Sequence, residues 1–379
     1  MTTTAARPAA ALSSAPPAAE YAAHPAAHPA AHPAAAARHV GPQWFPAAMG
    51  TGILATCTEQ FAPAVPVLHA VSLAVLLLAW AVLAVVGTAF VRSALRSPDR
   101  FRASVADLAV FPFYGTLAMG LLAVGSATLA VAGRHAPEPA TAAAWTLWTV
   151  GTLLGVFTAL VHPVRLLAAA PAVRGRPTFL WGLPVVPPMV SAAGGGVLAG
   201  TLPPRAATAM LLVCAALFLL ALGLGTAVFA LAYGRLLRGH EPPLQGSAAV
   251  WIPLGVAGQS TAAANFLLVA ADGVTPPALL AALGGPVAVH SALALGLGAA
   301  AGVLALGVTV RALRRGMVFG PGWWSFTFPV GTMSLGAFAF GTAFDLPWLV
   351  AVSAVLCACL AGTVALCLVR SVRSWLPGR

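Results

Sequence analysis

Lysine is missing from this 379-residue chain, and charged residues of any kind are scarce, at 7% against 60% hydrophobic residues. A soluble domain usually has about 25% charged residues. The composition therefore excludes an ordinary soluble protein. Together with a mean hydropathy of +0.93, it predicts an all-α protein that is embedded in a lipid bilayer and uses most of its length as one helical bundle.

Acidic residues are also few: 8, against 19 basic residues that are all arginine, which gives a net charge of +11. Nucleic-acid binding would need these arginines on one concentrated basic face. They are instead scattered through short segments between apolar stretches. We therefore predict no nucleic-acid partner and interpret the arginines as determinants of membrane topology.

The five cysteines all lie in apolar stretches. A disulfide framework or a zinc site would need spaced pairs of cysteines in polar segments. We expect all five to be small buried hydrophobic residues; they are Cys57, Cys214, Cys357, Cys359 and Cys367. The sequence predicts neither a metal centre nor a cofactor.

Residues 1–41 are dominated by alanine and proline, and His24, His28 and His32 each precede a proline. Three histidines at a spacing of four could bind a metal on a helix, but the prolines argue against that helix. We expect a disordered tail without a signal peptide. Residues 42–371 are predicted to form a transmembrane transporter domain, and 372–379 a short cytoplasmic C-terminal tail.

High hydropathy begins near residue 43 and is broken only by short polar or Pro/Gly segments. About 20 apolar residues cross a bilayer as a helix, which predicts ten spans. Their limits are 43–62, 65–91, 107–132, 141–163, 179–200, 207–234, 248–271, 278–310, 323–343 and 347–370.

Arginines alternate between the loops in a way that predicts orientation. The loops after odd-numbered spans contain only Arg134 and Arg205, and these loops also carry four acids, Glu59, Glu138, Asp272 and Asp345. The other loops contain Arg92, Arg96, Arg100, Arg102, Arg165, Arg174, Arg176, Arg235, Arg238, Arg311, Arg314 and Arg315. By the positive-inside rule, both termini are predicted to be cytoplasmic.

The odd-numbered spans share a proline that follows a bulky residue and precedes small residues. These prolines recur at intervals of about 70 residues, the length of one helical hairpin; they are Pro46, Pro112, Pro184, Pro253 and Pro329. Proline and glycine are common in membrane helices in general, but here they recur in alternate spans only. The pattern predicts five helical hairpins, with an inner ring of Pro-kinked odd helices around a central pore. In the ninth span, the kink is expected around Thr327 and Phe328.

The inner spans carry hydroxyls, an amide and glycines but hardly a charge. The pore-lining candidates are Gly50, Thr51, Gly52, Thr116, Ser191, Gln259, Thr261, Thr332 and Ser334. The lack of acids within these spans argues against a cation path, and arginines around one mouth would concentrate anions. A membrane enzyme is a distant alternative, because no nucleophile with a base, carboxylate pair or metal cluster stands at membrane depth.

Two stretches, WFPAAMGTGI at 44–53 and WWSFTFPVGTMSLGAFAFGTAF at 323–344, resemble the first and ninth helices of the tellurite-resistance/dicarboxylate transporter family. That family includes bacterial tellurite-resistance proteins, fungal malate permeases and sulfite efflux pumps, and plant slow-type anion channels. The resemblance implies a homotrimer in which every protomer has its own pore.

The resemblance also implies a pore gate, a phenylalanine of the ninth helix that matches Phe328; Phe326 is the weaker candidate. It implies transport across the plasma membrane of a C4-dicarboxylate such as malate, of sulfite, or of small inorganic anions. Whether the protein is a channel or a proton-coupled carrier with a saturable site stays open. The inner ring offers no bidentate arginine clamp for a dicarboxylate.

Overall fold

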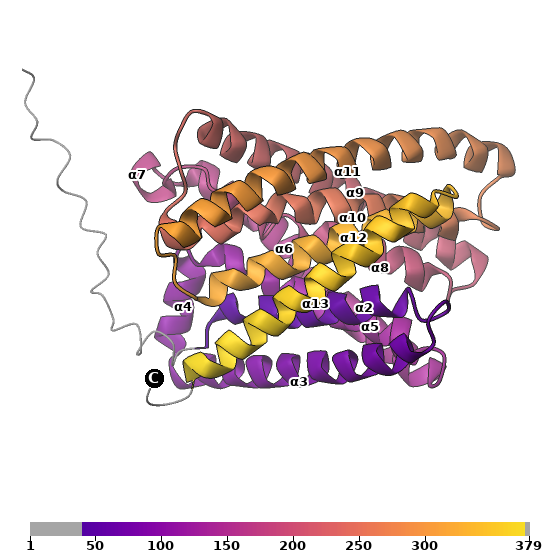
Figure 1. Ribbon diagram of the computed structural model, residues 1–379, viewed down its shortest axis with the longest axis horizontal. Coiled ribbons are helices and arrows are strands. Elements are labelled where there is room, and N and C mark those ends of the chain that lie inside the picture. Colours follow the sequence, from indigo (N-terminus) through magenta and orange to yellow (C-terminus); the bar gives the residue numbers. More distant parts are fainter. Residues whose placement is uncertain (1–39, 376–379) are drawn as a thin grey trace, which may run out of the picture. The chain divides into compact units, whose positions relative to one another are not determined.

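A computed structural model describes residues 40–375, and these residues form twelve α-helices and five 3₁₀-helices without any strand. Figure 1 shows the helices running side by side. Five are long: α3 (Val67–Arg96), α6 (Pro137–Ala168), α9 (Pro204–Leu237), α11 (Pro277–Arg314) and α13 (Pro347–Trp375). Helix α13 thus continues beyond residue 371, where the sequence predicts that the domain ends.

Five shorter helices alternate with the long ones: α2 (Pro46–Glu59), α5 (Tyr114–Ala132), α8 (Pro187–Ala199), α10 (Ile252–Ala271) and α12 (Thr327–Ala343). Each follows a 3₁₀-helix: η1 (Pro42–Trp44), η2 (Phe111–Phe113), η3 (Phe179–Gly182), η4 (Leu244–Trp251) and η5 (Pro321–Phe326). Two small helices, α4 (Pro98–Ala106) and α7 (Pro171–Arg174), connect long helices to the next 3₁₀-helix.

Eight helical segments are long and apolar enough to cross a membrane, where the sequence predicts ten spans. They are the five long helices and the stretches that contain α5, α8 and α10. The two predicted spans that are not among these eight contain α2 and α12, which have 14 and 17 residues. A 3₁₀-helix precedes each of them, as it does α8, which has 13 residues and is counted together with η3. The chain is a multi-pass membrane protein.

Burial separates the two sets of helices. In the most apolar windows of the spans containing α5, α8 and α10, between 61% and 89% of residues are buried, against 17% to 33% in the long helices. Nearly every residue of α2 and α12 is buried too. Since bulky apolar side chains remain exposed on the long helices, the long helices present the surface suited to lipid.

The buried helices contact one another in a closed order: α2 touches α5, α5 touches α8, α8 touches α10, α10 touches α12, and α12 touches α2. Each buried helix also contacts the long helix that follows it in the chain. In Figure 1, α3 and α11 lie on opposite sides of the bundle with α2, α5, α10 and α12 between them. We call α2, α5, α8, α10 and α12 the inner helices.

Prolines stand at the beginning of the inner helices rather than in their middle. Pro46 and Pro253 occupy the first turns of α2 and α10, and Pro329 lies in the first turn of α12. Pro112 is within η2, and Pro184 lies between η3 and α8. A first-turn proline removes no helical hydrogen bond. In η5 and α12, the 3₁₀-helix changes to α-helix at Thr327.

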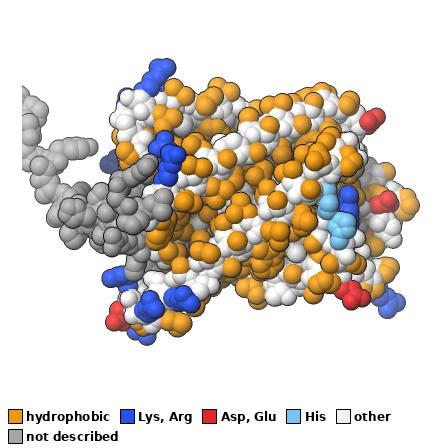
Figure 2. Space-filling view, turned by 60° about the horizontal axis from the view of Figure 1, so that its bottom comes forward, with side chains coloured by type: hydrophobic (Ala, Val, Ile, Leu, Met, Phe, Trp, Pro, Cys, Tyr) orange, Lys and Arg blue, Asp and Glu red, His pale blue; other side chains and the backbone are white. Residues whose placement is uncertain are grey.

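We call the end of the bundle at which the inner helices begin the proline end, and the other the far end. Figure 2 shows hydrophobic side chains across the middle of one face, with arginines gathered mainly towards one end and acidic and histidine side chains mainly towards the other. This is the distribution of a surface with a lipid-facing band between two polar edges.

One ion-pair cluster at the proline end makes stability depend on pH. Glu241, in the loop after α9, accepts bonds from Arg315 Nη1 at 2.6 Å and Arg311 Nη1 at 2.5 Å on α11. These arginines, Arg315 first, hold the pKa of Glu241 below its usual 4.5. A depressed carboxyl pKa stabilises the fold above the unfolded value, and this contribution is lost as the pH falls through the folded value. We expect Glu241→Gln to lower the melting temperature slightly at pH 7 and not at pH 3, measured by thermal unfolding in detergent.

Candidate functional site

A cavity of about 410 Å³ opens within the inner ring towards the far end. All five inner helices contribute to its wall, for example through Leu122 of α5, Val197 of α8 and Phe338 of α12. The wall is mainly apolar, and the polar side chains on it are Thr56, Glu59, Gln60, Ser126, Arg134, Gln259 and Thr342. A mostly apolar concavity with a few convergent polar groups is the usual form of a ligand site.

A second cavity, of about 30 Å³, lies at the proline end. Its wall is formed by α2, α5, α10 and α12, by the 3₁₀-helices η2 and η5, and by residues between η3 and α8. Pro46, Thr116, Phe328 and Pro329 belong to its wall. On α10, Gly255 lines the small cavity and Gln259 the large one. The two cavities thus follow one another along the axis of the ring. Their walls are four residues apart on α10, about 6 Å along the helix, and six residues apart on α12, from Pro329 to Leu335, about 9 Å.

Phe328 lines the small cavity. Its side chain is 4% exposed and belongs to the largest apolar cluster of the described residues, together with Trp324 and Met333. Phe326, two residues earlier, lines neither cavity and packs edge-on against Trp251 and Trp323, with ring centroids 5.7 and 5.8 Å away. The structure therefore distinguishes the two candidate gate residues: Phe328 lines the small cavity, and Phe326 lines neither cavity.

Among the predicted pore-lining residues, the structure places Gln259 on the large cavity and Thr116 on the small one. Several of the others use their hydroxyls within the bundle. Thr51, Thr261 and Thr332 donate to carbonyls of their own helices, those of Ala47, Ala257 and Pro329. Ser191 accepts from Thr152 of α6 at 2.9 Å, and Ser334 is 3.0 Å from the hydroxyl of Ser353 on α13.

The predicted glycines Gly50 and Gly52 serve close helix contacts. A Cβ atom on Gly50 would collide with Thr327, and one on Gly52 would press on the backbone of Ala123 in α5. Neither glycine, nor Pro112, Pro184 or Pro253, lines either of the two cavities.

Gln259 brings an amide to the cavity, and the carbonyl end of this amide has no fixed partner. It is 3% exposed, and its Oε1 has no hydrogen-bond partner within residues 40–375. The two ends of an amide are assigned rather than observed. A buried amide on a cavity wall can therefore turn its N–H groups towards a bound anion.

The large cavity also carries charge, which corrects the sequence-based view of the inner spans. Glu59, assigned to a loop by the sequence, is the last residue of α2, lines the cavity and is only 5% exposed. Arg134, just after α5, lines the same cavity. A buried carboxylate needs partners to offset its desolvation, and Glu59 has them.

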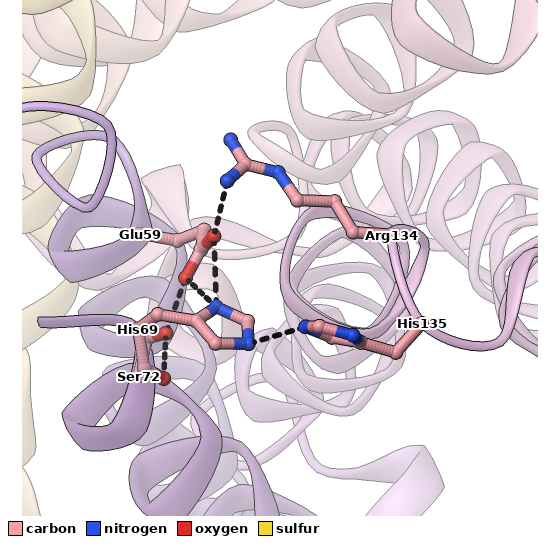
Figure 3. Close-up of polar contacts among 5 residues, drawn as sticks. All are labelled: Glu59, His69, Ser72, Arg134 and His135. Carbon is pink, nitrogen blue, oxygen red and sulfur yellow. Dashed lines mark hydrogen bonds and ion pairs between the residues drawn. The ribbon is translucent and has the colours of Figure 1, made fainter. Parts of the chain in front are cut away.

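Glu59 is surrounded by hydrogen-bonding groups from α3 and from the segment after α5 (Figure 3). His69 Nδ1 lies 3.0 and 3.1 Å from its two carboxylate oxygens, and Ser72 donates to one of them. Arg134 Nη1 lies 3.8 Å from Oε1. On the other side of the His69 ring, Nε2 lies 2.8 Å from Nε2 of His135. The only sequence signal for this cluster is an acid at the end of an apolar span with a histidine ten residues on.

The remaining predictions concern metals and cysteines. Within residues 40–375, no group of three or more His, Cys, Asp or Glu is placed to hold a metal ion, and His24, His28 and His32 lie outside the described residues. Three cysteines, Cys57, Cys214 and Cys367, are buried as expected, whereas Cys357 is half-buried and Cys359 is exposed. The prediction of five buried cysteines is wrong for Cys359, which lies on the outer face of α13.

A ring of buried helices around cavities that hold charged and polar groups, covered by long apolar helices, defines a multi-pass membrane transport protein. The chain matches the voltage-dependent anion channel family, SLAC1, over residues 39–372 and belongs to that family. It is a transport protein rather than an enzyme.

Similar proteins include three fungal sulfite efflux pumps named SSU1. Those of Trichophyton rubrum and Arthroderma benhamiae are 28% identical to this chain over 311 residues, which cover 81% of the chain and 83% of each relative. That of Arthroderma otae is 27% identical over 308 residues, 80% of the chain and 82% of the relative.

Proposed function

We propose that this protein moves sulfite or another small inorganic anion through a path formed by the two cavities, with Phe328 as the gate. The observation that carries the proposal is the succession of two cavities along one ring of five inner helices, with Phe328 at the smaller one. Membership of an anion channel family and similarity to sulfite efflux pumps supply the substrate class.

The cavity favours a small anion over a C4-dicarboxylate such as malate. Arg134 is the one cationic side chain among the residues lining the large cavity, whereas recognition of two carboxylates calls for paired, preferably bidentate, donors. A single arginine together with the amide of Gln259 suits one compact anionic group. Malate is the alternative substrate.

We also propose that the chain crosses the membrane ten times. Two of these spans combine a short α-helix with the 3₁₀ turn before it: η1 with α2, at 42–59, and η5 with α12, at 321–343. The closed ring of contacts and the pairing of each inner helix with the next long helix support five hairpins around a central pore. The arginine-rich proline end is then cytoplasmic, as are both termini. Similarity to the efflux pumps supports the plasma membrane, and the family resemblance supports a homotrimer.

For the remaining predicted residues, we propose supporting roles. The five prolines and their 3₁₀ turns set the narrow entrance at the proline end, and Gly50, Gly52, Thr51, Ser191, Thr261, Thr332 and Ser334 fix the spacing and orientation of the inner helices that form the pore wall. The hydrogen bonds and close contacts of these residues support this assignment.

The experiment that tests the proposal is reconstitution of the full chain in liposomes, followed by flux of sulfite, chloride, nitrate and malate. We expect sulfite or a small inorganic anion to move faster than malate and faster than through protein-free liposomes. The absence of flux for all four anions would contradict the proposed function. Saturation of the rate with anion concentration would support a carrier rather than a channel.

Arg134 offers a matched test of anion attraction. Removing one charged hydrogen-bond partner costs about 1.5–3 kcal/mol, and about 1.4 kcal/mol corresponds to a tenfold change in affinity. We therefore expect Arg134→Gln to raise the half-saturating anion concentration by about tenfold or more. Arg205→Gln is the control, because Arg205 is exposed at the start of α9 and does not line the cavity. Equal affinity in both variants would exclude Arg134 from the anion site.

A further inference from the structure

The Glu59 cluster connects the exposed surface of the protein with a carboxylate in the cavity. His135 is exposed, His69 is 25% exposed, and Glu59 is 5% exposed. The three side chains follow one another in hydrogen-bond contact, from His135 Nε2 to His69 Nε2 and from His69 Nδ1 to Glu59 (Figure 3). Only Glu59 of these three lines the cavity.

The short contact between the two imidazoles limits which of their ring nitrogens can carry a proton. Two ring nitrogens 2.8 Å apart form a hydrogen bond only if one of them carries a proton and the other offers a lone pair. His69 Nδ1 faces an acidic partner and carries a proton towards it, so its Nε2 is the acceptor while the ring is neutral. His135 is then the donor through Nε2–H, with Nδ1 free to take a proton from water.

We propose that Glu59 binds a proton that is transported together with the anion, and that His135 and His69 deliver this proton from bulk water. The inference rests on the proposed anion transport and extends it to a coupled carrier. A proton binds His135 Nδ1, the Nε2 proton of His135 passes to His69 Nε2, and the Nδ1 proton of His69 passes to Glu59. One proton leaves the water and one reaches the carboxylate, while each ring ends as the opposite neutral tautomer.

Arg134 supplies the coupling between the proton and the anion. While Glu59 is ionised, its negative charge lies 3.8 Å from Arg134 Nη1 and opposes the entry of an anion into the same cavity. Protonation of Glu59 removes that charge and leaves Arg134 available to the anion. The anion and the proton therefore favour each other's binding, a reciprocity that linkage requires.

Few other ionisable side chains near Glu59 could bind the transported proton in its place. From α3 it is faced by His69 and Ser72, and from the segment after α5 by Arg134, with His135 behind His69. The residues of α8, α10 and α12 that line the cavity include no ionisable side chain. Glu59 is thus the single carboxylate on the cavity wall.

The test compares two transport modes in liposomes that contain the full chain, with radioactive sulfite as the probe. Exchange of sulfite at equal pH on both sides needs anion binding but no net proton movement. Net uptake driven by an inward proton gradient needs both. The membrane potential is held at zero with potassium and valinomycin, and protein-free liposomes at the same outer pH give the background from diffusion of the neutral acid.

Glu59→Gln keeps the shape of the side chain but cannot exchange a proton, and His69→Gln still donates to Glu59 but cannot pass a proton through. With one pH unit across the membrane, we expect about tenfold faster net uptake by the wild type than at equal pH. We expect less than about twofold acceleration in both variants, each measured relative to its own exchange at equal pH. Glu241→Gln, which removes a carboxylate from ion pairs at the proline end, is expected to behave as the wild type.

The outcomes separate the inference from the function on which it rests. Exchange by the wild type without acceleration by the proton gradient overturns the coupling and leaves anion transport standing. Acceleration in Glu59→Gln overturns the role of Glu59, and acceleration in His69→Gln overturns the delivery route. Loss of exchange in a monodisperse Glu59→Gln protein also overturns the inference, because Glu59 is then required for the anion path itself. Absence of exchange in the wild type contradicts the proposed function.

Discussion

Replacement of Phe328 by alanine is expected to raise anion flux by about tenfold or more, a lowering of the barrier by at least about 1.4 kcal/mol. The reason is geometric: Phe328 is buried in the wall of the smaller cavity, whose volume is only about 30 Å³, so its ring narrows the proposed path there. Removing the ring widens this narrow part of the path. The measurement is the initial rate of sulfite or chloride release from liposomes containing equal amounts of wild-type or variant protein.

Phe326→Ala is the matched control for this experiment. It makes the same chemical change two residues away, in a ring that packs against Trp251 and Trp323 and lines neither cavity. We expect its flux to stay within about twofold of the wild type. Equal flux in the wild type and both variants would remove the gate from Phe328 without contradicting anion transport.

Gly258→Ala is expected to have the largest effect on folding. A Cβ atom at Gly258 of α10 would overlap with the backbone of Thr332 and Met333 in α12, and a Cβ on Gly336 would meet the Gly258 carbonyl in return. Backbone atoms of two packed helices cannot move aside as a flexible side chain can. Overpacking usually costs about 1–3 kcal/mol, and here we expect a loss at or above the top of that range.

The melting temperature of the purified protein in detergent measures this effect, together with the fraction that elutes as a monodisperse species. Gly296→Ala on α11 is the control, because a Cβ there meets nothing within 4 Å, and alanine favours a helix over glycine by about 1 kcal/mol. We expect Gly296→Ala to be neutral or stabilising. A stable, monodisperse Gly258→Ala protein would contradict the close approach of α10 and α12.

The order of helices follows from the sequence because it rests on strong and local signals. Runs of apolar residues identify the long helices, and the recurring prolines identify the inner ones, although the sequence predicts kinks where the structure has the first turns of helices. The length of α2 and α12 could not be predicted in the same way. Proline fixes φ without specifying whether the preceding turn is 3₁₀ or α, so hydropathy alone counts residues 43–62 and 323–343 as full spans.

The site was predicted less completely than the fold. Glu59 stands at the end of an apolar segment, where sequence alone cannot distinguish a loop acid from one that turns into a cavity. Its burial depends on His69 and Ser72 of α3 and on Arg134 after α5, all of which approach only in three dimensions. In the same way, hydroxyls such as that of Ser334 look like pore-lining groups until the partner on α13 is known.

The closed region between the two cavities also has an electrical consequence. Where water fills a cavity, little of the membrane voltage falls across it, so the voltage drop concentrates where the protein is closed. On the proposed path, that is the small cavity lined by Phe328 and the closed layer of roughly 6–9 Å beyond it. Moving one elementary charge through the full potential is worth about 2.3 kcal/mol per 100 mV. On the proposed path, an anion would therefore experience most of the driving voltage within this short closed region, and its flux would depend steeply on the membrane potential.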